Sequence, residues 1–227
     1  MIKLVAFVVN GIDEWDGYKT AYNGGTGVIP AYRGKRLTST IYDFLEPKFK
    51  AAGIEQCTLE VIKKNDKAVK VYEHIGFEVV RGFNCFAGSL KRELRPLKAP
   101  FLIRTRKDCD WDNWEKYWEY NPSWENSKEA IERNLDSYII EELMDDEKGI
   151  GYIIFHPKSG RISQLGVDRT YRNKGFGKQL LKRVMQHNSN VSINNVESNA
   201  WAMLSFLQKC GFKNPINQYE MKKMLIS

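Results

Sequence analysis

Apolar residues alternate with polar ones in some segments and recur with a helical period in others, and the order of these patterns predicts an α/β fold. The first part of the chain is expected to form strands at 3–12, 18–29 and 56–62, helices at 36–52 and 65–75, and one or two strands within 77–90. Turn signals agree with this order, because Asp16-Gly17 is typical of a hairpin and Gly76 of a helix end.

The second part of the chain repeats this order after an additional opening segment. We expect strands at 101–106, 137–144 and 191–196, a hairpin over 148–168, helices at 176–187 and 199–210, terminal strands up to residue 226, and a helical region at about 111–135 that is broken near Asn121-Pro122. The stretch 91–100 is charged and carries two prolines, which favour neither a helix nor a central strand. It therefore predicts two tandem units, residues 1–95 and 96–227, each a mixed twisted sheet flanked by helices.

One short segment occurs twice in the chain. Residues 27–36 read GVIPAYRGKR and residues 166–175 read GVDRTYRNKG, with Gly, Val, Tyr, Arg and Lys in register. Each half later carries a Gly-Phe pair, whose glycine follows the repeated valine by 48 residues in the first half and by 44 in the second. A repeat of this extent indicates two copies of one domain.

The second copy has the chemistry of a phosphate site. The run Arg172-Asn173-Lys174-Gly175-Phe176-Gly177 places two glycines and two cations where a strand turns into a helix. Glycine lets a ligand approach the backbone closely, and the free N–H groups and dipole of a first helical turn attract an anion. The run is neither a Walker loop nor the Gly-x-Gly-x-x-Gly dinucleotide fingerprint. The alternative is an ordinary strand–helix turn with a basic face.

An Arg-x-x-Gly-x-Gly loop after a strand, followed by a helix, a strand, a second helix and Gly-Phe, resembles the GCN5-related N-acetyltransferases. The resemblance covers nearly the whole chain as two tandem units, the first without counterparts of the family's opening strand and two helices. It implies an acyl-CoA-dependent N-acyltransferase that moves acetyl from acetyl-CoA to a primary amine by direct attack in a ternary complex. The acceptor would be a small molecule or a peptide amine, and no metal is implied.

The resemblance assigns CoA binding to the two repeated loops and their flanks. The residues that it marks are Val28, Arg33, Gly34, Lys35, Arg36, Thr38, Asn65, Val167, Arg172, Asn173, Lys174, Gly175, Phe176, Gly177 and Lys178. Arg36 and Thr38 stand where the family has glycines. The first loop is therefore either a poorer CoA site or a loop kept for helix packing.

The catalytic residues implied by the resemblance fall in both units. Tyr72, four residues before Gly76, matches the tyrosine that protonates the leaving CoA thiolate, and Leu207 stands at that position in the second unit. Glu60 and Glu197, each associated with the strand after a loop helix, are candidate bases for the acceptor amine. The alternatives are a core tyrosine and two solvated carboxylates.

Residues 108–125 are rich in acids and hold four of the six tryptophans. Trp111, Trp114 and Trp118 would share one face of a helix. This segment is either a packing surface or an acceptor groove lined by aromatics and acids, which suits an amine.

Composition narrows the remaining classes of function. The net charge is +7, but there is no long Lys/Arg tract and no nucleic-acid reader motif, so nucleic acid is not an expected partner. The three histidines do not cluster, and the four cysteines form no Cys-x-x-Cys pair, so neither a metal site nor a disulfide framework is expected. No apolar run is long enough to span a membrane.

These features predict a cytoplasmic tandem N-acetyltransferase. A tandem module that binds CoA or a partner without turnover remains the main alternative, and a nucleic-acid binder is suggested only by the net charge. The sequence leaves open the acceptor, the acyl length, the unit that is active and the oligomeric state.

Overall fold

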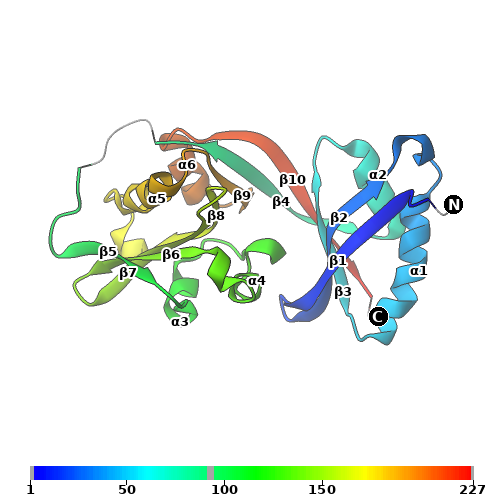
Figure 1. The fold of residues 1–227 in the computed structure, drawn as a ribbon, viewed down its shortest axis with the longest axis horizontal. Helices are drawn as coiled ribbons and strands as arrows, with labels where there is room; N and C mark the ends of the chain where they lie inside the picture. Colours follow the sequence, from blue (N-terminus) through cyan, green and yellow to red (C-terminus); the bar gives the residue numbers. More distant parts are fainter. Residues whose placement is uncertain (1–2, 91–94, 226–227) are drawn as a thin grey trace. The chain divides into compact units, whose positions relative to one another are not determined.

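A computed structural model describes residues 3–90 and 95–225 of the chain (Figure 1). The described chain forms two compact units, an N-terminal unit made of Met1–Gly82 with Asn217–Ser227 and a C-terminal unit made of Phe83–Ile216. The predicted boundary between residues 95 and 96 divides the two sequence repeats rather than these compact units, and it stays a prediction. Residues 91–94 of the predicted linker lie outside the described residues.

The N-terminal unit is a mixed sheet with two α-helices. Its elements are β1 (Ala6–Trp15), β2 (Tyr18–Val28), the 3-10 helix η1 (Pro30–Tyr32), α1 (Leu37–Ala51), β3 (Gln56–Ile62), α2 (Asp66–Ile75), the first part of β4 (Glu78–Gly88) and the last part of β10 (Lys213–Met224). The strands follow the order β1-β2-β3-β10-β4. Strands β2 and β3 are parallel, whereas β1 with β2 and β3 with β10 are antiparallel.

Local signals explain the helix ends in this unit. The side chain of Asn65 accepts a hydrogen bond from the backbone N–H of Ala68 at 3.2 Å, which starts α2. Gly76 ends α2 with a φ of 99°, a left-handed conformation that suits glycine. The apolar faces of α1 and α2 then pack on the sheet around Phe49, Leu59 and Phe77.

The C-terminal unit contains the remaining described strands of the same ten-stranded mixed sheet. Its elements are β5 (Phe101–Arg106), α3 (Trp111–Trp114), η2 (Glu115–Tyr117), η3 (Trp124–Asn126), α4 (Lys128–Glu132), η4 (Leu135–Ser137), β6 (Ile139–Asp145), β7 (Lys148–His156), β8 (Arg161–Val167), η5 (Arg169–Tyr171), α5 (Phe176–His187), β9 (Val191–Glu197) and α6 (Trp201–Lys209), with the remaining parts of β4 and β10. The strand order is β10-β4-β9-β8-β7-β6-β5. Strands β8 and β9 are parallel, and β4 and β9 are antiparallel.

These elements confirm the predicted α/β class with helices flanking mixed strands, although the described strands form one ten-stranded sheet where two sheets were expected. The prediction for 111–135 is wrong in extent, because this stretch forms short α and 3-10 turns instead of one helical region with a single break. Tertiary contacts outweigh the helical pattern here: the ring of Trp114 stacks on Tyr152 with centroids 4.2 Å apart, and Trp118 Nε1 donates to the Tyr152 hydroxyl at 2.7 Å. The end of the chain forms one strand, β10, where terminal strands in the plural were expected.

Strands β4 and β10 each contribute to both units. The division falls between Gly82 and Phe83 within β4, and between Ile216 and Asn217 within β10. The last residues of the chain therefore complete the sheet of the N-terminal unit, where β10 pairs with β3 from Gln218–Ile62 to Met224–Gln56.

Candidate functional site

Two parallel strands of the C-terminal unit separate at their ends. Strands β8 and β9 are paired at Arg161–Ser192 and Ile162–Ile193, although β8 continues to Val167 and β9 to Glu197. A register shift in the pairing with β7 leaves Ser163 as an extra residue of β8. Such a bulge bends the strand that carries it, and the opening begins at this residue.

A cavity of about 440 Å³ lies at this opening. Its walls come from the end of β8, Asn195 of β9, the loop 172–178 at the start of α5, one face of α6 and the segment 117–122. The site therefore joins the repeated loop to a space large enough for part of a small-molecule ligand.

The loop before α5 has the backbone shape of an anion site. Gly175 is the N-cap of α5 with a φ of 91°, and a side chain placed there would meet no atom within 4 Å. The backbone N–H groups of Lys178 and Gln179 both donate hydrogen bonds to the Gly175 carbonyl, at 3.1 and 3.3 Å. The N–H groups of Phe176 and Gly177 belong to the first turn, where no helical carbonyl precedes them. This end of the cavity can hold a phosphate group.

The side chain of Arg172 fixes the shape of this loop. Its Nε donates to the carbonyl of Val167 at 3.0 Å, and one terminal nitrogen donates to the carbonyl of Tyr117 at 2.8 Å. The guanidinium thus connects the end of β8 with the segment that closes the cavity. Lys174 lies over the ring of Tyr171, with its ammonium nitrogen 4.8 Å from the ring centre.

The loop of the N-terminal unit has the same construction. Gly34 and Arg36 have φ values of 78° and 56°, matching 64° at Asn173 and 91° at Gly175. Both loops therefore keep two left-handed positions, but glycine occupies the first in one loop and the second in the other. Arg33 Nε donates to the Val28 carbonyl at 3.2 Å, as Arg172 does to Val167.

Two other residues of the N-terminal unit that are expected to bind CoA lie at the starts of its two α-helices. Asn65 is exposed and its side chain caps α2, as described above. Thr38 is half-buried in the first turn of α1. Their contact with CoA stays a prediction.

Tyr72, the expected acid, lies in the aromatic core of the N-terminal unit. Its ring meets Tyr42 and Phe77 edge to face, with centroids 6.5 and 5.7 Å away. Asn23 Nδ2 donates to the hydroxyls of Tyr42 at 2.9 Å and of Tyr72 at 3.4 Å. Burial raises the pKa of the Tyr42 hydroxyl. Tyr72 therefore has the environment of a core tyrosine, which was the alternative to its catalytic role. Its role as the acid stays a prediction.

The two candidate bases are both half-buried. Glu60 accepts a hydrogen bond from the Tyr22 hydroxyl at 2.6 Å, within the N-terminal unit. Glu197 ends β9 opposite Phe83, and it is not among the described residues that line the cavity. Their catalytic roles stay predictions.

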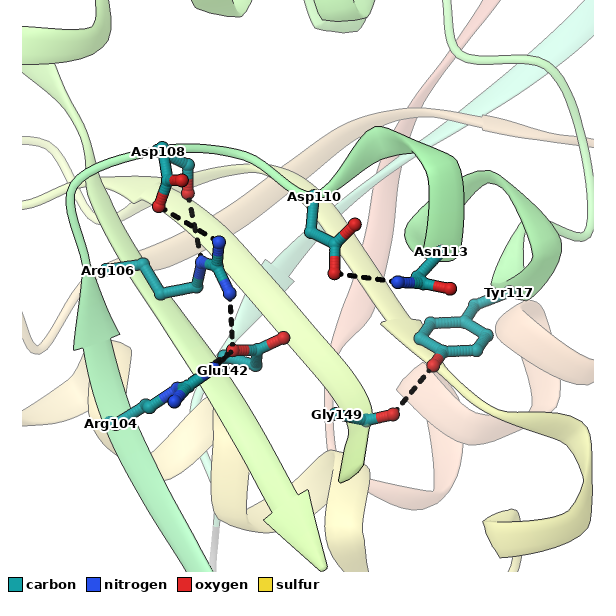
Figure 2. A network of polar contacts seen from close by, with 8 residues as sticks. All are labelled: Arg104, Arg106, Asp108, Asp110, Asn113, Tyr117, Glu142 and Gly149. Carbon is teal, nitrogen blue, oxygen red and sulfur yellow. Dashed lines mark hydrogen bonds and ion pairs between the residues drawn. The ribbon is translucent and has the colours of Figure 1, made fainter. Parts of the chain in front are cut away.

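The acids of residues 108–125 bind groups of the protein itself (Figure 2). Asp108 pairs with Arg106 at 3.0 Å and Asp110 accepts from Asn113 at 2.9 Å. Further along, Glu115 pairs with Lys128 at 2.8 Å and Glu125 pairs with Arg161. The predicted combination of aromatics and acids is therefore divided. Tyr117, Trp118 and Tyr120 line the cavity, as does Glu119, whereas the other tryptophans and acids of this stretch are not among its described lining residues.

Sequence reasoning missed a chain of neutral polar groups at the cavity. Trp118 donates to the Tyr152 hydroxyl, which donates to Gln164 Oε1 at 2.6 Å, and Gln164 Nε2 donates to the Asn126 carbonyl at 2.7 Å. Burial raises the pKa of the Tyr152 hydroxyl, so it stays protonated. Strands β7 and β8 are buried along almost their whole length, so no alternation marks Tyr152 and Gln164, and nothing local shows that they meet.

No three His, Cys, Asp or Glu side chains within residues 3–90 and 95–225 are arranged to hold a metal ion. Among the described helices, none has the length and hydropathy to cross a membrane.

Comparisons with known proteins agree with this geometry. The family model described as "Acetyltransferase (GNAT) family" matches residues 3–77 and 104–212, one segment in each half. No curated protein sequence matches the chain.

Solved structures show the same fold at low identity. A tandem GNAT protein from the clavulanic acid biosynthesis pathway is 14% identical with a TM-score of 0.72, over 98% of this chain and 80% of that one. A GCN5-related N-acetyltransferase from Sphaerobacter thermophilus is 16% identical with a TM-score of 0.64, over 98% and 76%. Another, from Kribbella flavida, is 11% identical with a TM-score of 0.64, over 97% and 88%.

Proposed function

Because this chain belongs to the GNAT acetyltransferase family, we propose that its C-terminal unit transfers acetyl from acetyl-CoA to a primary amine by direct attack in a ternary complex. The observation that carries this proposal is the cavity of about 440 Å³, which extends from the loop at the start of α5 to the aromatic segment 117–122. One cavity thus offers an anion-binding end and a separate wall for an acceptor.

The residues of this unit fit acetyl-CoA, which supplies an acyl group activated as a thioester. The N–H groups of Phe176 and Gly177, with the dipole of α5, would hold the pyrophosphate, and Lys178 adds a positive charge on the cavity wall. The edge of β8 beyond Ile162 is separated from β9, so its backbone groups can bind the amides of the CoA arm. Four free cysteines suit the reducing cytoplasm, where we propose that the protein works.

Proton transfer in this unit has no tyrosine at the family position, because Leu207 stands there and is buried. The leaving thiolate would take its proton from the attacking amine or from water. Tyr72, Glu60 and Glu197 stay predictions for the acid and base roles.

The test is a calorimetric titration of acetyl-CoA into the parent chain and two matched variants. Gly175→Glu and Arg36→Glu place the same carboxylate at the N-cap of α5 and of α1, and Gly175→Ala controls for the strain that any side chain meets at a φ of 91°. Like charges repel at the phosphate site, so Gly175→Glu should weaken binding by about 100-fold or more, equivalent to roughly 2.7 kcal/mol. Arg36→Glu should change it less than threefold.

The choice of Gly175 over Gly177 matters for this experiment. A Cβ at Gly177 would lie 2.9 Å from Cζ of Phe206, so a substitution there also disturbs the packing of α5 on α6. If Arg36→Glu abolishes binding and Gly175→Glu does not, the N-terminal unit holds the cofactor and the proposal is wrong.

The second candidate is a tandem module that binds CoA without turnover, and the leucine at position 207 is the observation that favours it. Thiol release from acetyl-CoA in the presence of primary amines separates the two. Stoichiometric binding without thiol release would select the binding module.

A further inference from the structure

The wall of the cavity in the C-terminal unit is nearly free of negative charge. Of the described residues that line it, Glu119 alone carries a carboxylate. Arg172, Lys178 and Lys209 line the same cavity and are positive. Arg172 and Lys178 lie at the loop that would hold the pyrophosphate, so an acceptor with several ammonium groups would meet one carboxylate and one further cation, Lys209, on the described wall.

Glu119 already has two hydrogen-bond donors within the protein, one on each oxygen. One of its oxygens accepts from the backbone N–H of Ala202 at 2.9 Å, and the other accepts from that of Met203 at 3.0 Å. Both N–H groups belong to the start of α6, whose dipole already stabilises this carboxylate.

Neighbouring acids do not supply the missing charge. Figure 2 shows Asp108 bound to Arg106 and Asp110 bound to Asn113, and neither acid lines the cavity. Burying an ammonium group without a counter-ion is unfavourable, and burial favours the neutral form of an amine.

The aromatic side chains of the wall offer mainly ring surface. The Tyr117 hydroxyl donates to the Gly149 carbonyl at 2.9 Å, and burial raises its pKa to about 12. The indole N–H of Trp118 and the Tyr152 hydroxyl donate along the chain to Gln164. With these donors occupied within the protein, the rings can pack against an apolar ligand.

We propose that the acceptor is a monoamine with an aromatic or apolar body, and that polycationic amines are excluded. This inference rests on the proposed function, because it assigns the 117–122 end of the cavity to the acceptor. The amine enters as the neutral base, with its apolar body against Trp118 and the tyrosines, and a wall that is poor in acids favours this neutral form, whose lone pair is available for attack.

Binding and turnover are measured separately to test the proposal. With CoA present, 2-phenylethylamine and spermidine are titrated by calorimetry, and with acetyl-CoA present the thiol release from each is followed. We expect 2-phenylethylamine to bind at least tenfold more tightly than spermidine. Tighter binding of spermidine, or no binding of either amine, would overturn the proposal.

Two tryptophans of one segment provide a matched pair of variants. The indole N–H of Trp118 donates to the Tyr152 hydroxyl at the cavity. The indole N–H of Trp111 donates to Glu132 at 2.6 Å, and Trp111 is not among the described residues that line the cavity. Trp118→Leu should weaken 2-phenylethylamine binding at least tenfold while acetyl-CoA binding is retained, and Trp111→Leu should weaken it less than threefold. Equal effects of the two substitutions would contradict the assigned wall.

The two readouts distinguish the failure of each proposal. If 2-phenylethylamine binds as expected but releases no thiol, the transfer reaction is wrong and the recognition of an apolar monoamine stands. If thiol is released faster with spermidine, transfer stands and the acceptor class is wrong.

Discussion

At the scale of single residues, Glu119 shows how a carboxylate can serve a helix far away in the sequence. It occupies both free N–H groups at the start of α6, a role usually filled by the N-cap residue, which here is Ala200 and makes no side-chain cap. The same contact holds the segment 117–122 against α6 and so closes the cavity.

We expect Glu119→Ala to lower the free energy of unfolding by about 1 kcal/mol, because two N–H groups lose their acceptor. The control is Glu147→Ala, in the exposed turn between β6 and β7, which should stay within about 0.5 kcal/mol of the parent. Urea denaturation measures both. Equal losses would show that Glu119 does not stabilise α6.

Some residues of the candidate site could be predicted from the sequence, and others could not. The loop 172–177 was predictable because its glycines, its cations and the following helix are all local signals. The cavity wall was not, because Glu119 meets Ala202 and Tyr152 meets Gln164 only after the sheet has formed. The sequence left residues 108–125 as either a packing surface or an acceptor groove lined by aromatics and acids, and of these acids Glu119 alone is among the described residues that line the cavity.

At the scale of elements, one buried carboxylate of β6 binds two arginines of β5. Strand β5 is the last in the strand order of its unit, and Glu142 of β6 binds both Arg104 at 2.8 Å and Arg106 at 3.0 Å (Figure 2). Arg104 faces Glu142 directly across the pair of strands. The side chain of Glu142 is 2% exposed, that of Arg106 is 19% exposed and that of Arg104 is 50% exposed.

We expect Glu142→Ala to cost about 1.5–3 kcal/mol of stability, because it removes charged hydrogen bonds to both arginines. Arg104→Ala should cost less than about 1 kcal/mol, because its partner keeps Arg106 and the lost pair is half exposed. Chemical denaturation of the two variants tests this order. A larger loss in Arg104→Ala would contradict it.

Elements were predictable where their signals are local. Helices α1, α2, α5 and α6 follow their apolar periodicity, and Gly76 ends α2 as expected. The stretch between β5 and β6 also has a helical pattern of tryptophans, but the stacking of Trp114 on Tyr152 selects short turns. Packing between residues far apart in the sequence determines the structure of this stretch, so no short segment of the sequence predicts it.

At the scale of the whole molecule, the two sequence repeats do not coincide with the two compact units. In the N-terminal unit, Met221 of β10 is fully buried, and Glu220 forms an ion pair with Arg81 at 2.7 Å. A fragment that ends at residue 95 lacks both residues, together with the strand that pairs with β3.

We therefore expect residues 1–95 to show no cooperative unfolding when expressed alone. Co-expressed with residues 96–227 as a separate chain, they should co-purify with it, because β10 then completes the N-terminal sheet. Affinity purification through a tag on the second fragment, followed by thermal denaturation, tests this. A cooperative transition of residues 1–95 alone would show that β10 is dispensable.

The place of β10 also sets the order of events during synthesis. The ribosome synthesises Met1–Gly82 first. It then translates Phe83–Ile216, and this second step takes on the order of 10 s at typical rates. Only after that interval does β10 emerge and pair with the open edge of β3, from Gln218 to Met224. The unit that is translated first is thus finished last, and until then the nascent chain must be kept from pairing that edge with another polypeptide.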